Sequence, residues 1–261
     1  MPNPQGSFVW HELMTPNPDA AVGFYSTVLG WGTQIWQGPE PYTMFANGDV
    51  TLGGIWPLDA DQQAEGATPQ WMPYVGVRDV DATAAEAARL GATVLKQPQD
   101  IPDTGRFAVL HDPQGAIFAI FAPQNHAGAQ EAAQEDAAPQ QGEFSWHELT
   151  TTDHSAAFDF YSRIFGWEKT ESFDMGPMGV YQMYGQAGST YGGMFNKTPE
   201  MPVSPNWLCY VRVDDVKRAA EAVKRGGGTV TNGPMEVPGG SWIAQCVDPQ
   251  GAPFAVHQLK K

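Results

Sequence analysis

Two glutamates are the residues of this sequence best suited to acid–base chemistry. Glu12 and Glu148 occupy the same tetrapeptide, Trp-His-Glu-Leu, at positions 10–13 and 146–149. On a strand, Trp and Glu would share one face and His the other. A carboxyl group beside an apolar wall has a raised pKa and can act as a general acid or base near neutral pH. The alternative is a Glu that pairs with a tyrosine hydroxyl or lies at a solvated pocket mouth.

The two histidines of this tetrapeptide are a second possibility for chemistry. His11 and His147 precede the glutamates directly, so His and Glu cannot serve one mononuclear metal site on a strand. We expect both imidazoles to be structural groups, hydrogen-bonded beneath a helix layer. A slip of one residue in strand register would reverse every side chain and make them candidate metal ligands.

Large side chains supply the candidate walls of a ligand site. These apolar and aromatic candidates are Trp10, Met44, Trp56, Met72, Tyr74, Trp146, Met183, Phe195 and Tyr210. Aromatic rings of this kind line pockets for organic ligands, and ordinary core packing is the alternative use. Arg106 is a basic candidate near the groove, or else a surface residue, and Trp242 occupies the corresponding position later in the chain.

An internal repeat decides which elements position these residues. The 26 residues from Gly6 and the 26 residues from Gly142 are identical at 14 positions, with an offset of 136. The same offset relates Trp71 to Trp207 and the Asp-Pro-Gln-Gly-Ala segments at 112–116 and 248–252. The chain therefore contains two copies of one domain, called copy one and copy two below.

A segment rich in Ala, Gln, Glu and Pro separates the copies. We interpret it as a linker over 123–142, with a short helix possible over 130–135. The predicted domains are accordingly residues 1–122 and 143–261.

Each copy shows the same order of elements twice. In copy one, a strand over 8–14 precedes an amphipathic helix over 18–29, with Asn17 or Asp19 as its cap and Gly30 as its end. The other expected elements are strands at 42–46, 51–56, 72–77, 93–96, 107–111 and 116–121 and a helix at 80–90, with turns at Asn47-Gly48 and at 112–115. The pattern predicts an α+β chain of four βαβββ modules.

The ordered motifs resemble the vicinal oxygen chelate superfamily, which includes glyoxalase I, extradiol dioxygenases and bleomycin-binding proteins. They are an "AxxFY" helix ending in "GW", a "GG" strand, a "VxDVD" junction and a "DPQGA" turn, and most of them occur in both copies. The resemblance implies two domains, each an open curved sheet with helices outside and the ligand inside the curve.

The resemblance also implies positions for a divalent metal. In this sequence those positions hold Trp10, Met72 and Ala119 in copy one, and Trp146, Leu208 and Ala255 in copy two. None is a usual ligand for Zn, Mn, Ni or Fe. We therefore expect no metal and no cofactor.

Composition narrows the possible partners and compartments. The formal net charge of -15 disfavours nucleic acid and anionic membrane surfaces. No apolar run approaches the roughly 20 residues of a membrane helix, and no signal peptide is visible. The two cysteines, Cys209 and Cys246, form no disulfide framework, so we expect a reduced cytoplasm. Because two fused copies can do within one chain what single-domain members of the superfamily do as a dimer, we also expect a monomer with internal pseudo-twofold symmetry.

These observations favour a metal-free, small-molecule-binding protein. Like the bleomycin-binding branch that it resembles, it would hold an aromatic or cationic ligand in a groove lined by Trp, Tyr and Glu. One alternative is a glyoxalase-like lyase or isomerase that acts on a small carbonyl compound through Glu12 or Glu148. Another is an interaction module in which copy two is only scaffold.

Overall fold

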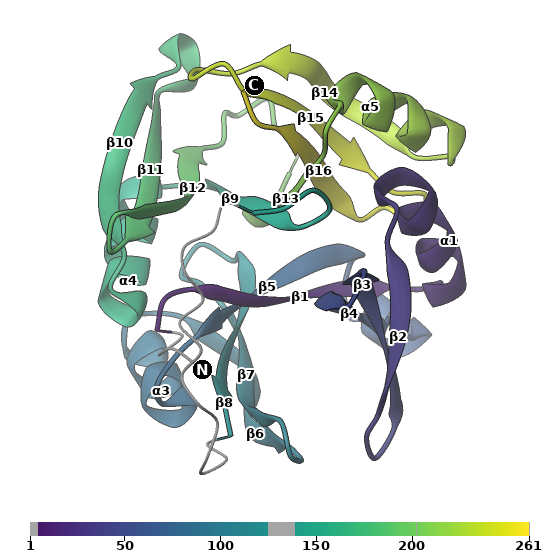
Figure 1. Cartoon of the computed structure of the whole chain (residues 1–261). Helices are drawn as coiled ribbons and strands as arrows, with labels where there is room; N and C mark the ends of the chain where they lie inside the picture. Colours follow the sequence, from purple (N-terminus) through teal and green to yellow (C-terminus); the bar gives the residue numbers. More distant parts are fainter. Residues whose placement is uncertain (1–4, 125–138, 202, 261) are drawn as a thin grey trace. The chain divides into compact units, whose positions relative to one another are not determined.

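The computed structural model describes residues 5–124, 139–201 and 203–260. The chain is an α+β protein with two eight-stranded mixed sheets, one from each copy (Figure 1). The strand order is β2-β3-β4-β1-β5-β8-β7-β6 in copy one and β10-β11-β12-β9-β13-β16-β15-β14 in copy two. The two orders correspond strand for strand, which confirms the predicted repeat and fold class.

Copy one holds eight strands and three helices. The strands are β1 (Phe8–Thr15), β2 (Gly32–Gln37), β3 (Pro41–Asn47), β4 (Val50–Pro57), β5 (Gln70–Gly76), β6 (Thr93–Ile101), β7 (Gly105–His111) and β8 (Ile117–Pro123). The helices are α1 (Pro18–Leu29), α2 (Ala60–Ala64) and α3 (Val80–Arg89).

Copy two repeats this order of strands, and its short 3-10 helix lies between β10 and β11, whereas α2 of copy one lies between β4 and β5. Its strands are β9 (Phe144–Thr151), β10 (Glu168–Asp174), β11 (Val180–Gln186), β12 (Ser189–Asn196), β13 (Asn206–Arg212), β14 (Thr229–Glu236), β15 (Trp242–Val247) and β16 (Pro253–Gln258). Its helices are α4 (His154–Phe165), η1 (Gly176–Met178) and α5 (Val216–Arg225).

The first helix shows why the local predictions succeed. Asn17 caps α1 by accepting a hydrogen bond from the backbone of Ala20 at 3.1 Å, and Pro18 fits the first turn, where no donor is needed. Gly30 ends the helix with a φ of 76°, a left-handed conformation that glycine adopts without strain. Of the two predicted caps, Asn17 is therefore correct and Asp19 is not.

Two elements of copy one were not predicted, and one turn was misplaced. β2 is an edge strand whose side chains are largely exposed, so it carries no strong hydrophobic pattern. α2 has only five residues, started by a capping box at Asp59. The hairpin predicted at Asn47-Gly48 turns one residue later, over Gly48 and Asp49, because Asn47 still pairs with Val50 in the ladder.

The chain divides into two compact units that do not follow the two copies. Of the described residues, unit 1 contains 5–9, 73–124 and those of 147–207, whereas unit 2 contains 10–72, 139–146 and 208–260. Each unit thus combines one βαβββ module from each copy. The domain limits inferred from the repeat stay a prediction, and residues 125–138, with the predicted helix over 130–135, lie outside the described part.

Unit 2 is held by a buried relay between the copies. Helices α1 and α5 pack together in it (Figure 1). The indole of Trp71 donates to the hydroxyl of Tyr25 at 2.8 Å, and Tyr25 donates to Asp248 at 3.2 Å. The other oxygen of Asp248 accepts from the backbone of Gln250 and Ala252, which forms the predicted turn. The "FY" tyrosine of copy one therefore binds the "DPQG" aspartate of copy two.

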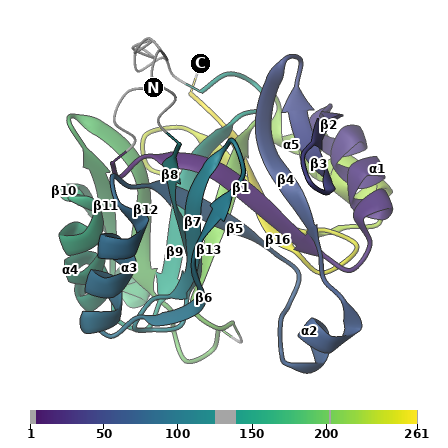
Figure 2. The same ribbon diagram turned by 90° about the horizontal axis from the view of Figure 1, so that it is seen from below.

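Unit 1 contains the reciprocal relay. Helices α3 and α4 pack together in it (Figure 2). Trp207 donates to Tyr161 at 3.2 Å, and Tyr161 donates to Asp112 at 2.9 Å. Burial is the main reason that the pKa values of both tyrosines and both aspartates are raised. The two units are stabilised by the same contact with the roles of the copies exchanged.

The tryptophans of the two "GW" motifs add a second reciprocal contact. In unit 2, Trp31 of copy one donates to the carbonyl of Gly142 in copy two at 2.7 Å. In unit 1, Trp167 of copy two donates to the carbonyl of Gly6 in copy one, also at 2.7 Å. An isolated copy would lose these buried hydrogen bonds, so the copies are interdependent.

Within the described residues, no helix is long and apolar enough to cross a bilayer.

Candidate functional site

The sheet face opposite the core of unit 2 carries the candidate residues of copy one. Strand register places Glu12 opposite Gly54 and Gly54 opposite Met44, so Glu12 and Met44 share a face. Trp56 pairs with Met14 on the same face and is 42% exposed. The alternate residues of β1, such as Leu13, enter the core. The predicted orientation of β1 is therefore correct.

Glu12 lies at the end of a short hydrogen-bond chain. The indole of Trp10 donates to the hydroxyl of Tyr42 at 3.2 Å, and Tyr42 donates to Oε1 of Glu12 at 2.7 Å. Glu12 is 5% exposed. Burial, and then the charge of Glu12, raise the pKa of Tyr42, so its hydroxyl stays protonated and keeps donating. The pairing with a tyrosine hydroxyl, foreseen as the alternative for Glu12, is the one observed.

Gly54 leaves the space that Tyr42 occupies. A Cβ atom at Gly54 would lie 1.6 Å from the Tyr42 hydroxyl, closer than any real contact. The glycine pair of the "GG" strand therefore has a direct role in this site: the missing side chain lets the tyrosine reach Glu12 across the sheet.

Copy two contributes the equivalent arrangement to unit 1. Tyr181 donates to Oε2 of Glu148 at 2.9 Å, and a Cβ atom at Gly193 would lie 2.0 Å from the Tyr181 ring. Register places Glu148 and Met183 on one face through Gly193. Phe195, at the position of Trp56, is only 7% exposed and stacks on Tyr181 with ring centroids 6.0 Å apart.

The two tyrosines that bind the glutamates were not predicted. The repeat offset of 136 does not align Tyr42 with Tyr181 in the sequence, because copy two has three additional residues before β11. Aligning the "GG" strands changes the local offset to 139 and superimposes the tyrosines. That shift is the signal in the sequence that could have found them.

The remaining candidates lie on the second module of each copy, except Trp146, which lies on the first. In unit 1, Tyr74 lies 6.2 Å from the ring of Phe107, and Lys96 lies 5.0 Å above the same ring. In unit 2, Tyr210 accepts a hydrogen bond from Gln245 at 3.0 Å. Met72 is buried on β5, and Trp146 is half-buried on β9.

Of the two positions predicted for Arg106, near the groove or at the surface, the surface position is the one observed. Its guanidinium pairs with Asp81 in the first turn of α3, at 2.6 Å, and with Asp100 on β6, at 2.9 Å. It alternates along β7 with Phe107, which lies on the same face as Tyr74. Arg106 therefore belongs to the helix-covered side of the sheet, because two aspartates bind it there.

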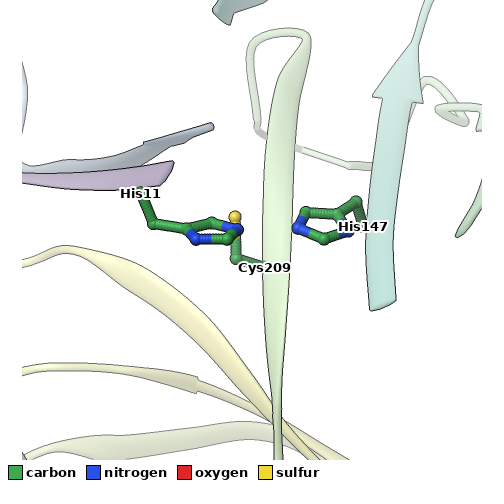
Figure 3. A group of neighbouring side chains, drawn as sticks. All are labelled: His11, His147 and Cys209. Atoms are coloured by element: carbon green, nitrogen blue, oxygen red, sulfur yellow. The ribbon is translucent and has the colours of Figure 1, made fainter. Parts of the chain in front are cut away.

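His11 and His147, drawn in Figure 3, share a strand face with the core residues Leu13 and Leu149, as predicted. In unit 2, His11 stacks on Phe144 with ring centroids 3.6 Å apart, and its Nδ1 lies 3.4 Å from the carbonyl of Leu52. In unit 1, His147 stacks on Phe8 at 3.6 Å, and burial lowers its pKa to about 3. His147 is therefore a neutral imidazole at physiological pH.

Cys209 of β13 is the third side chain drawn in Figure 3. Its sulfur lies within 4.8 Å of a ring nitrogen of His11 in unit 2. Imidazole and thiolate are zinc ligands, but burial raises the pKa of the Cys209 thiol, so it is protonated at neutral pH. Both cysteines are free and buried, and burial raises the pKa of Cys246 to about 12. They form no disulfide, as expected.

Known families and relatives agree with this fold. The family described as a glyoxalase-like domain matches residues 10–121, and the Glyoxalase/Bleomycin resistance protein/Dioxygenase superfamily matches residues 143–256. A glyoxylase-like domain-containing protein of Didymella fabae is 33% identical over 90 residues, which are 70% of its length and 33% of this chain. The chain belongs to the vicinal oxygen chelate superfamily.

Two further relatives match different lengths of this vicinal oxygen chelate protein. The putative glyoxylase CFP32 of Mycobacterium bovis is 42% identical over 124 residues, and the match covers only 46% of either chain, about half the length of that relative. The anthracycline biosynthesis protein DnrV of Streptomyces peucetius is 29% identical over 273 residues, which cover 98% of this chain and 94% of DnrV.

Solved structures show the same fold at low identity. The Mn(II)-bound glyoxalase of Novosphingobium aromaticivorans is similar with a TM-score of 0.64 and 16% identity, over 98% of this chain and 83% of that one. The 2,3-dioxygenase LapB of Pseudomonas sp. KL28 gives a TM-score of 0.65 and 14% identity, over 96% and 91%.

Proposed function

We propose that this chain binds a flat aromatic organic molecule on the sheet faces that carry the Tyr–Glu pairs. One observation carries the proposal: Trp56 is 42% exposed and lies on the same face as the buried Tyr42–Glu12 pair. An indole left open to water beside fixed polar groups offers stacking area and orientation together, which is the usual make-up of a small-molecule site.

The electrostatics and one relative point to the kind of ligand. A net charge of -15 favours neutral or cationic molecules over anions. DnrV, which aligns over nearly the whole chain, is named for anthracycline biosynthesis, and anthracyclines are fused-ring aromatic compounds. We therefore propose a fused-ring ligand, neutral or cationic.

We also propose that binding needs no metal at the superfamily's usual positions. Trp10 has no lone pair to offer, and its indole N–H is used to donate to Tyr42. Met72 offers only a thioether, and Ala119 offers no donor atom at all. The residues at these positions do not fit a divalent ion, so we assign no step to one.

A titration tests both parts of the proposal. We expect 2-methoxynaphthalene to bind in isothermal calorimetry to protein that contains less than one metal ion per ten chains. Trp56→Ala should weaken binding about 5-fold or more, since a stacked aromatic is worth about 1 kcal/mol. Ile35→Ala, at an exposed apolar residue on the edge strand β2, is the control. Absence of binding, or equal binding by both variants, would contradict the proposal.

The Tyr42–Glu12 distance of 2.7 Å favours a second candidate, a lyase or isomerase acting on a small carbonyl compound. Glu12 would take a proton from the carbon next to the carbonyl group and return it to the former carbonyl carbon, and the Tyr42 hydroxyl would turn its single hydrogen from Glu12 to the carbonyl oxygen when the substrate binds. The test is turnover of the methylglyoxal–glutathione adduct by the purified chain. Turnover lost in Glu12→Gln would support this function, and no turnover would exclude this substrate.

A monomeric state and a cytoplasmic location are parts of the same proposal. Size-exclusion chromatography and cell fractionation test them.

A further inference from the structure

Copy two carries a polar cluster on its share of unit 2. Tyr210 and Gln245 both pair with Ala255 of β16, and His257 lies two residues further along that strand. Strand alternation therefore places the three side chains on the face opposite the core. Gln245 donates to Tyr210 at 3.0 Å, and Asn232 donates to Gln245 at 3.3 Å. At one edge, the Ser145 hydroxyl lies 3.1 Å from Nδ1 of His257 and 3.4 Å from the backbone carbonyl of Tyr210.

The Ser145 hydroxyl fixes which nitrogen of His257 holds the proton. A carbonyl oxygen can only accept, so Ser145 must donate its single hydrogen to Tyr210 if both contacts are hydrogen bonds. His257 must then donate from Nδ1 to the serine oxygen. A neutral imidazole has one N–H, so Nε2 is left with a lone pair that can accept.

The surroundings keep this imidazole neutral. His257 is 9% exposed, and burial is the main cause that lowers its pKa to about 4, with the charge of Arg212 as the second cause. Arg212 is the cross-strand neighbour of His257. Among the described residues, none makes a hydrogen bond to Nε2 of His257. The atom is therefore an acceptor at neutral pH with its lone pair unused by the fold.

Copy one shows that the fold does not require this cluster. At the offset of 136, Val9 replaces Ser145, Phe121 replaces His257 and Val109 replaces Gln245. The ladder is the same in both copies, since Phe107 pairs with Phe121 where Ile243 pairs with His257. Three polar groups at positions that apolar residues fill equally well suggest selection for a ligand.

We propose that Nε2 of His257 accepts a hydrogen bond from a ligand hydroxyl group, so that copy two selects hydroxylated aromatic molecules. The inference deepens the proposed function and rests on it. It adds the class of substituent that is recognised, and it assigns that recognition to copy two.

Two probes that differ in one substituent test the proposed function and the present inference separately. 2-Naphthol can donate a hydrogen bond, whereas 2-methoxynaphthalene cannot. We expect wild-type protein to bind 2-naphthol about 5- to 10-fold more tightly, the effect of one hydrogen bond in a buried site. Trp56→Ala protein, measured in parallel, should keep this preference because the variant removes stacking area that both probes would use and leaves His257 in place. If neither probe binds, the proposed function fails; if both bind equally to wild-type protein, only the present inference fails.

Two variants then assign the preference to the relay. His257→Phe introduces the residue of copy one and should reduce the preference to about one. Ser145→Val, the other copy-one residue, should reduce it too, because the imidazole proton is no longer held on Nδ1. Nitrogen NMR should show protonated Nδ1 in wild-type protein only, a signature that a structural role alone would not change. A preference that persists in His257→Phe, or a proton found on Nε2 in wild-type protein, would overturn the proposal.

Discussion

The second modules of the two copies share a core side and differ on the opposite side. Phe118 and Phe254 occupy equivalent buried positions, one in each unit. On the other face, copy one has Val109 and Phe121 where copy two has Gln245 and His257. Core residues are restricted by packing, whereas residues on the opposite face are restricted by what they contact. The comparison indicates that the copies share an architecture and present different side chains on the face opposite the core.

The helix side shows a second difference at equivalent positions. In unit 1, Arg106 pairs with Asp81 of α3. In unit 2, the same two positions hold Trp242 and Lys217 of α5, and the Lys217 ammonium lies 4.9 Å above the Trp242 ring. An ion pair and a cation–π contact thus join helix to sheet at the same place. The contact between helix and sheet is thus present at this position in both units, although the type of interaction differs.

The largest expected effect concerns the relays that both copies share. Trp71→Ala and Trp207→Ala should each lower the free energy of unfolding by about 3–5 kcal/mol, because each removes a buried indole and a donor to tyrosine. Denaturant unfolding measures both values. Where an alanine variant does not fold, Tyr25→Phe and Tyr161→Phe give a milder comparison. A loss in only one of the two units would break the symmetry argued here.

An effect of intermediate size is expected on the pH dependence of stability, because copy two has His257 where copy one has Phe121. The pKa of His257 is lowered from 6.5 to about 4. As the pH falls, the imidazole is therefore protonated in the unfolded chain at a higher pH than in the folded protein. The contribution of neutral His257 to the free energy of unfolding is about 3 kcal/mol and is complete above pH 6.5. It is lost as the pH falls from about 6.5 to 4. His257→Phe should therefore lose less stability than wild-type protein between pH 7 and 4. Parallel curves for the two proteins would contradict the assignment.

The smallest effect is expected on the helix side. Arg106→Ala removes an exposed ion pair, so its thermal midpoint should stay close to that of wild-type protein, and any difference should shrink as salt is added. Lys217→Ala provides the comparison in unit 2. A large loss that salt does not change would show that Arg106 has a role beyond this pair.

The candidate site was predictable where it depends on alternation along a strand. The tetrapeptide at 10–13 places Glu12 and His11 on opposite faces, and the structure agrees because β1 is regular. The partner of Glu12 was not predictable in this way, since Tyr42 comes from another strand and reaches Glu12 only where Gly54 leaves room. The sequence left open whether Arg106 lies near the groove or at the surface, because its position depends on Asp81, a residue of a packed helix.

The sequence by itself determined the repeat, the four modules and the local features that begin and end their helices and turns. Caps, glycine stops and side-chain alternation depend on neighbours in the chain, so they can be derived from it. Only the tertiary structure decided that each compact unit combines a module from each copy. That choice depends on contacts such as Tyr25 with Asp248, 223 residues apart, whose energy comes from burial in a shared core. No local pattern records which core two distant residues will share.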